Sequence, residues 1–154
     1  MSRTRVLILC TGNSARSQMA EGILRHDGGE DFEVASAGVN PGSVRPEAIA
    51  VMAEIGIDIS SHWSKSIVDL GDRQFDVVIT VCDHAREVCP VLPGNAEKIH
   101  RSFEDPPSVE AAGILGADKT MAIFRRVRDE IRAWMKNFIT EKISNTSNHI
   151  EEQI

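Results

Sequence analysis

The most informative segment of the sequence reads Val6-Leu7-Ile8-Leu9-Cys10-Thr11-Gly12-Asn13-Ser14-Ala15-Arg16-Ser17. It begins as a continuous apolar run, which is typical of a strand buried on both faces of a parallel sheet. The run ends at a cysteine that small and polar residues follow. Gly12 and Asn13 are the residue types that best tolerate left-handed backbone conformations, and a helical pattern begins after them. The segment therefore predicts a strand, a tight loop and a helix in succession.

The loop has the composition of an oxyanion site, since backbone N–H groups and the helix dipole would place positive potential at one point. That field and the Arg16 guanidinium, a fork for two oxygens of a phosphate-like anion, are expected to lower the pKa of Cys10. Ser17 is placed to donate a hydrogen bond to the sulfur. The predicted oxyanion-binding residues are Thr11, Gly12, Asn13, Ser14, Ala15 and Arg16. The alternative is that Cys10 is merely a small buried apolar residue.

The rest of the chain alternates strands and helices. Strands are predicted over residues 5–9, 32–37, 75–82 and 97–103. Helices are predicted after the loop, from Arg45-Pro46 to Gly56, and along a C-terminal face formed by Met121, Phe124, Val127, Ile131, Trp134 and Phe138. This alternation predicts an α/β fold of three layers, a four-stranded parallel sheet with helices on both faces.

Composition restricts the possible partners. The 154 residues predict one domain over residues 1–140 and an extension over 141–154 that lacks periodicity and is expected to be frayed or disordered. A formal net charge of −6 and a pI near 5.3 argue against nucleic acid and anionic membranes as partners. The apolar run that ends at Cys10 is too short for a signal peptide or a membrane span. Three cysteines, an odd number, suit a reducing compartment, so a cytoplasmic location is expected.

Two further cysteines bear on the chemistry. Cys82 ends the third predicted strand, so it is expected at the same sheet edge as Cys10. Cys89 follows seven positions later, and in a helix the two Cα atoms would lie roughly 10.5 Å apart, beyond the disulfide limit of about 7 Å. A bond between Cys82 and Cys89 would therefore require unwinding. Both could be incidental apolar residues, but three thiols can also form a relay that attacks an oxyanion, resolves the adduct and carries a disulfide to the surface.

Asp105 is the predicted general acid. It precedes Pro106-Pro107 after the fourth predicted strand, and proline would fix the backbone beside a carboxyl that protonates a leaving oxygen. An aspartate before proline can also be a simple turn former. No metal site is predicted, because metal-ligand spacing is absent from the histidines, which are His26, His62, His84, His100 and His149.

The pattern Cys10-x5-Arg16-Ser17 with Asp105-Pro106 downstream resembles the low-molecular-weight protein tyrosine phosphatases. With Cys82 and Cys89 added, the chain is similar to the thioredoxin-coupled arsenate reductases built on that fold. The resemblance covers about residues 4–140. It implies an enzyme of arsenical resistance and detoxification on a four-stranded parallel sheet flanked by helices.

The resemblance also implies a role for each candidate residue. Cys10 would attack arsenic, Arg16 and the loop amides would hold the arsenate oxygens, and Asp105 would protonate the departing oxygen. Cys82 would then attack Cys10 and release arsenite, and Cys89 would attack Cys82. The resulting disulfide would be reduced by thioredoxin or a similar dithiol, with no bound cofactor and a monomeric protein. Glutaredoxin with glutathione, or another thiol system, remains an alternative reductant.

Several relatives in this family bind potassium near the loop. The matching positions here are Asn13, Glu21 and Ser36, but Lys65 stands where those relatives have an aspartate. Because lysine removes an oxygen ligand and adds its own cation, potassium dependence is not expected.

Two other functions compete with arsenate reduction. A phosphatase acting on phosphotyrosine or small phosphomonoesters would use the same loop, but Pro107-Ser108 stand where tyrosine phosphatases of this family place aromatic residues. A redox-sensing module built on Cys82 and Cys89 would leave the Cys10 loop without a purpose.

Overall fold

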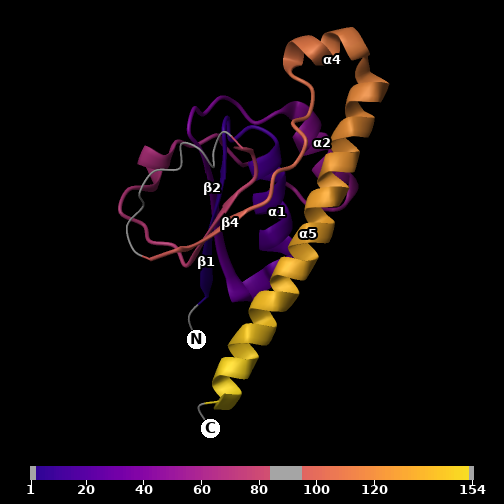
Figure 1. Ribbon diagram of the computed structural model, residues 1–154. Helices are drawn as coiled ribbons and strands as arrows, with labels where there is room; N and C mark the ends of the chain where they lie inside the picture. The colour runs from indigo at the N-terminus through magenta and orange to yellow at the C-terminus, as the bar shows by residue number, and fades with distance from the viewer. Residues whose placement is uncertain (1–2, 84–94, 153–154) are drawn as a thin grey trace.

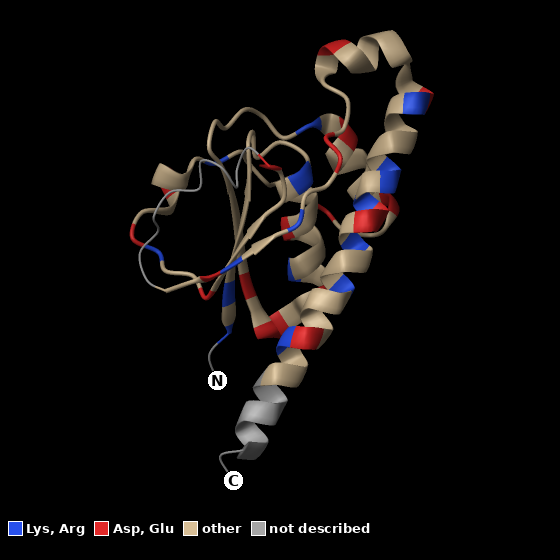
Figure 2. Cartoon of the chain, viewed as in Figure 1, with Lys and Arg blue, Asp and Glu red and all other residues tan. Residues whose placement is uncertain are grey.

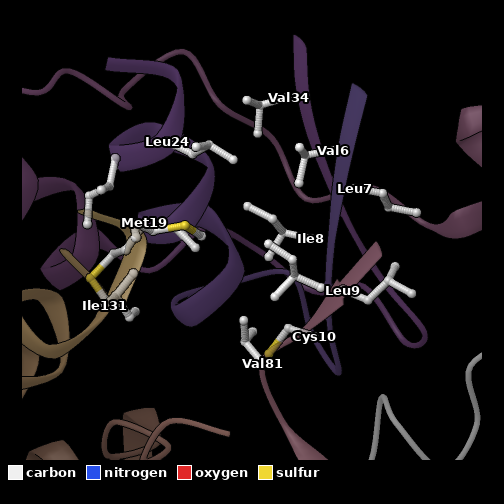
Figure 3. Close-up of a cluster of buried hydrophobic side chains, with 14 of the residues drawn as sticks. Val6, Leu7, Ile8, Leu9, Cys10, Met19, Leu24, Val34, Val81 and Ile131 are labelled. Atoms are coloured by element: carbon white, nitrogen blue, oxygen red, sulfur yellow. The ribbon is translucent and has the colours of Figure 1, made fainter. Parts of the chain in front are cut away.

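The apolar run of the first segment forms β1 (Thr4–Cys10), an inner strand of the sheet. In the computed structural model, which describes residues 3–83 and 95–152, the side chains from Val6 to Leu9 are fully buried. Val6 and Ile8 point toward α1 (Arg16–Gly28), and Leu7 and Leu9 point to the other side (Figure 3). Because consecutive strand residues face opposite sides, this burial means that both faces of β1 are covered.

The sheet has the order β2-β1-β3-β4, and all its neighbouring strands are parallel. The other strands are β2 (Phe32–Gly38), β3 (Val77–Thr80) and β4 (Glu97–His100). The prediction of a four-stranded parallel α/β sheet is confirmed, although β3 and β4 are shorter than predicted. In such a sheet the chain order reverses between β1 and β3, and ligands bind beyond the carboxyl ends of the strands at that point. Cys10 and Cys82 both lie there.

Helices cover the sheet on both sides within the described residues. On one side lie α1, α2 (Pro46–Glu54) and α5 (Ala117–Glu152), with α1 packed against α5 (Figure 1). On the other side lies the short 3-10 helix η2 (Ile67–Leu70), whose Leu70 is buried in the core. A second 3-10 helix, η1 (Gly29–Asp31), links α1 to β2.

The long C-terminal helix α5 buries the apolar face that its sequence predicts. Phe124, Val127, Ile131 and Phe138 are buried, and Trp134 stacks on the Phe138 ring at 5.6 Å between centroids. Lys and Arg, with fewer Asp and Glu among them, are spread along the rest of the described helix (Figure 2).

The structure differs from the sequence prediction at the C-terminal end. Helix α5 continues to Glu152, where the sequence predicts a frayed or disordered extension over residues 141–154. Extending an existing helix adds one hydrogen bond for each residue fixed, so weak periodicity is no barrier to its continuation. The pair of Lys142 with Glu97, at 2.6 Å, also ties this part of the helix to β4.

A short helix that the sequence did not predict, α4 (Val109–Leu115), precedes α5. Ser108 caps it by accepting a hydrogen bond from the N–H of Ala111 at 3.1 Å. Gly116, with φ +90°, ends it in a conformation that favours glycine. Within the described part of the chain, no helix combines the length and the apolar character needed to cross a membrane.

Gly38, at the end of β2, lies directly under the loop that follows Cys10. A Cβ there would lie 2.7 Å from the carbonyl oxygen of Thr11 and 2.9 Å from the nitrogen of Asn13, so the backbone would have to move.

We expect Gly38→Ala to lower the free energy of unfolding by about 1–3 kcal/mol in urea denaturation. Gly42→Ala is the matched control, because its Cβ would meet nothing within 4 Å, and we expect a change within about 0.5 kcal/mol. Equal stability of the two variants would contradict this packing.

Candidate active site

Asn13 holds the loop between β1 and α1 in its observed shape. It has φ 48°, a left-handed conformation, and its side-chain amide is bonded on both ends. Its Oδ1 accepts hydrogen bonds from the Gln18 Nε2 and the Lys65 N–H, each at 2.9 Å. Its Nδ2 donates to the hydroxyls of Ser17 at 2.7 Å and Ser36 at 2.9 Å. These bonds stabilise a backbone conformation that is otherwise unfavourable for a residue other than glycine.

The carbonyl groups of the loop face outward, toward residues 39–45. The hydrogen bonds are Val39 N–H to Cys10 at 3.2 Å, Asn40 N–H to Thr11 at 2.8 Å, Gly42 N–H to Gly12 at 3.0 Å and Arg45 N–H to Ser14 at 2.9 Å. Because the N–H of a planar trans peptide points opposite to its C=O, the N–H groups of Thr11, Gly12 and Ala15 face away from residues 39–45. The loop thus has the polarity of an anion site at the start of α1.

Arg16 and Asp105 meet across this site. The Arg16 side chain is 11% exposed, its Nη1 donates to the carbonyl oxygen of Phe103 at 3.1 Å, and its Nη2 lies 3.4 Å from the Asp105 Oδ1. The Asp105 side chain is 77% exposed. The loops after β1 and β4, about ninety residues apart, therefore bring a cation and a carboxyl together at one sheet edge.

Two thiols lie together in the site. Cys10 and Cys82 are both buried, and a hydrogen bond joins their side chains. The Thr11 hydroxyl lies 3.2 Å from the Cys82 sulfur. Cys10 lies beside Val81 at the carboxyl end of β1, which places Cys82 at the same edge (Figure 3).

The pKa of Cys10 differs from the sequence expectation. The hydrogen bond with Cys82 and burial raise the pKa of the Cys10 thiol, and they outweigh Arg16 and the Thr11 N–H, which lower it. The expectation of a lowered pKa was wrong for this arrangement, because it did not include a second thiol beside the first in a water-poor site. Cys10 is accordingly a thiol at neutral pH here, with the buried Cys82 thiol beside it.

Under the loop, Glu21 is a buried carboxylate with its own cations. Its side chain is 4% exposed, and Ser36 donates a hydrogen bond to its Oε1 at 2.7 Å. The Lys65 ammonium lies 3.8 Å from the same oxygen, and Arg25 pairs with Oε2 at 2.9 Å. The Lys65 ammonium also donates to the carbonyl oxygen of Trp63 at 3.0 Å. These residues do not fit a potassium ion, which would face the lysine charge beside the carboxylate it needs.

Several residues that support the loop were missed in the sequence. The Gln18 Oε1 lies 3.0 Å from His62 Nδ1, and the Ser64 hydroxyl donates to the Gly12 carbonyl at 2.8 Å. Burial lowers the pKa of His62, as do Arg25 and Lys65, against the opposing effect of Glu21. The contacts of His62 and Ser64 join positions more than forty residues apart, so no local pattern indicates them.

Two predicted site contacts remain predictions. The Ser17 hydroxyl accepts from Asn13, and its hydrogen bond to the Cys10 sulfur is untested. Cys89 lies outside the described residues, so its contact with Cys82 is also untested. In the described part of the chain, histidine, cysteine and carboxylate side chains form no cluster of three that could hold a metal ion.

Comparisons with known proteins agree with this geometry. The family model of the low molecular weight phosphotyrosine protein phosphatases matches residues 5–149. An arsenate reductase of Halalkalibacterium halodurans is 44% identical over 138 residues, which are 90% of this chain and 96% of that protein. A solved arsenate reductase in its oxidized state has a TM-score of 0.74 at 31% identity, covering 90% of this chain and 98% of that one. A thioredoxin-dependent arsenate reductase of Corynebacterium glutamicum has a TM-score of 0.65 at 30% identity, covering 91% and 63%.

The Glu21 site generates a prediction about potassium. We expect replacement of sodium by potassium at constant ionic strength to change the melting temperature by less than about 1 °C, because the Lys65 ammonium already compensates the charge of Glu21. Lys65→Asp should create a potassium-dependent increase of several degrees, since it supplies an oxygen ligand and removes the competing charge. Differential scanning calorimetry in the two salts measures both. A strong potassium effect on the unmodified protein would show that the ammonium does not fill this position.

Proposed function

Because the chain belongs to the low molecular weight phosphotyrosine protein phosphatase family, and arsenate reductases of that family match nine tenths of it, we propose that it reduces arsenate to arsenite. The observation that carries this proposal is the pair of buried thiols, Cys10 at the start of the oxyanion loop and Cys82 beside it after β3. A phosphatase needs one nucleophile, whereas a reductase needs a second thiol to supply electrons.

Arsenate would bind as a tetrahedral oxyanion. Arg16 offers a planar fork, and the contact with Phe103 holds it at the mouth of the loop. The N–H groups of residues 11–15 and the start of α1 would receive the remaining oxygens, so binding requires displacement of the Cys82 thiol from its place beside Cys10.

The first chemical step forms a bond between the Cys10 sulfur and arsenic. The proton that Cys10 carries must leave first, and an arsenate dianion is a base that can accept it. As one arsenic–oxygen bond breaks, Asp105 gives a proton to the departing oxygen, which leaves as water. Ser17 would stabilise the Cys10 sulfur through a hydrogen bond from its hydroxyl.

The second step transfers two electrons. The Cys82 sulfur attacks the Cys10 sulfur and forms a disulfide, while the arsenic–sulfur bond breaks and its electron pair stays on arsenic, which leaves as arsenite. Cys89 then attacks Cys82, so Cys10 is released as a thiol and a Cys82–Cys89 disulfide remains. A thioredoxin dithiol reduces that disulfide, becomes oxidised itself and restores the enzyme; the thioredoxin-dependent relative from Corynebacterium glutamicum supports this choice of reductant.

The proposed chemistry also suggests a cellular location for the enzyme. A relay of thiols that must be reduced after each turnover belongs in a reducing compartment, so we place the protein in the cytoplasm as a monomer that contributes to arsenical resistance. Residues 1–140 would form the catalytic domain, and we assign no chemical step to residues 141–154.

A phosphatase acting on phosphotyrosine or small phosphomonoesters is the second candidate, because the Cys10 loop chemistry is shared. One experiment separates the two: arsenite release with thioredoxin and its reductase is compared with aryl phosphate hydrolysis by the same preparation. Rapid aryl phosphate hydrolysis without arsenite release would overturn the reductase.

We expect Cys10→Ser to lower both arsenate reduction and any aryl phosphate hydrolysis by about 10⁴-fold or more, since a serine hydroxyl does not ionise to a nucleophile at neutral pH. Steady-state assays of both reactions measure this. The control is Cys10→Ser binding of sulfate, which should persist because Arg16 and the loop remain. Substantial turnover in either assay would remove Cys10 as the nucleophile.

Substitutions of the two remaining cysteines should block arsenate reduction at different steps. Cys82→Ser and Cys89→Ser should each stop multiple-turnover arsenate reduction while leaving slow aryl phosphate hydrolysis largely intact, because only reduction needs a second thiol. The Cys89 variant should stall as a Cys10–Cys82 disulfide after one turnover, whereas the Cys82 variant leaves the arsenic adduct unresolved. Thiol mapping by mass spectrometry after one equivalent of arsenate distinguishes these species. An active Cys82 variant would contradict the relay.

A further inference from the structure

Arg45 contacts two loops of the active site at once. It stands directly before α2 in extended backbone, and its N–H donates to the carbonyl oxygen of Ser14 in the oxyanion loop at 2.9 Å. Its side-chain Nη1 donates to the carbonyl oxygen of Pro107 at 2.7 Å. Pro107 lies two residues after Asp105.

The segment that carries Asp105 is held by backbone hydrogen bonds as far as Phe103, whose N–H donates to the Val81 carbonyl at 3.1 Å, and by side-chain contacts beyond it. Residues 101–108 form no helix or strand, and the Asp105 carboxyl is largely exposed. Before Asp105, Arg16 holds the carbonyl oxygen of Phe103. After it, the hydrogen bond from Arg45 holds the backbone. Asp105 therefore lies between two anchored carbonyl groups, each fixed by an arginine.

The guanidinium of Arg45 is itself held in place. Its side chain is 13% exposed, Nε donates to Glu47 at 3.2 Å, and its carbon lies 5.3 Å from the centre of the Phe124 ring. Among the described residues, the buried Nη2 has no hydrogen-bond partner. A buried N–H without an acceptor opposes folding, so stability alone does not explain an arginine at this position. The hydrogen bond from Arg45 to Pro107, in the segment that carries Asp105, gives the arginine a reason to be there.

We propose that Arg45 is a positioning residue, which holds Asp105 where it can give its proton to the departing oxygen. The inference rests on the proposed arsenate reduction and adds a residue to it. Between the anchor and the acid, Pro106 is buried and its ring fixes φ, so restraint of the Pro107 carbonyl restrains Asp105 as well. Glu47 pairs with the Arg45 charge, so Arg45 acts through geometry more than through its field.

Arg45→Met tests the proposal, because it keeps the stem against Phe124, removes the donors and leaves the backbone bond to Ser14. We expect the single-turnover rate of arsenite formation to fall about tenfold, with KM for arsenate changed less than about twofold. Arg45→Lys should lose about threefold, since an ammonium can replace one hydrogen bond but not the fork. The matched control is Arg73→Met, which removes an arginine 5.2 Å from the Phe75 ring and paired with Glu33; its rate should not change.

The decisive measurement repeats these variants in an Asp105→Asn background. If Arg45 acts through Asp105, the Arg45 substitutions should change the remaining rate less than about twofold there. A tenfold loss in both backgrounds, or a wild-type rate for Arg45→Met alone, would overturn the inference. If thermal unfolding shows that Arg45→Met is unstable, the same comparison with and without Asp105→Asn is made with Arg45→Lys. An unmodified protein that forms no arsenite would overturn the proposed function, which is a different result from an active protein indifferent to Arg45.

Discussion

The hydrogen bonds of the Asn13 side chain are the constraint on which the site depends. They hold one residue in a left-handed conformation, and through it they join α1, β2 and the segment around Lys65 to the loop. Every other contact of the site presupposes that shape. The outward carbonyl groups, the start of α1 at Arg16 and the space that the two thiols share all follow from a chain that reverses within five residues.

The thiol pair gives the site two states with opposite requirements. With the Cys82 side chain against Cys10, their hydrogen bond and burial raise the pKa of Cys10 and so disfavour the thiolate, the form that oxidants attack. With an anion in the loop, Arg16 and the N–H groups favour the thiolate. In the proposed reaction, Cys10 would therefore have low reactivity until the substrate binds.

Much of this arrangement could be predicted from the sequence, because it follows from local patterns. The buried β1, the turn at Gly12 and Asn13 and the apolar face of α5 each leave a periodic or compositional signal, and the parallel sheet then brings Cys10, Cys82 and Asp105 to one edge. What could not be predicted depends on distant partners. Arg45 and Ser64 reach the loop from other segments, the raised pKa of Cys10 needs a neighbour 72 positions away, and helix α4 lies in a stretch with little periodicity. The apolar pattern of α5 ends at Phe138, so no periodic signal indicates that the helix continues to Glu152.

The position of β1 within the sheet has a consequence for synthesis. β1 is made first, yet one of its two neighbours, β3, ends only at Thr80. At roughly 5–20 residues per second on the ribosome, about 4 to 14 s separate the appearance of Cys10 from that of the strand that shelters it. During that interval the thiol lacks its partner sulfur, and β3 does not yet pair with β1. The burial that leaves Cys10 3% exposed is therefore complete only after more than half of the chain has been made.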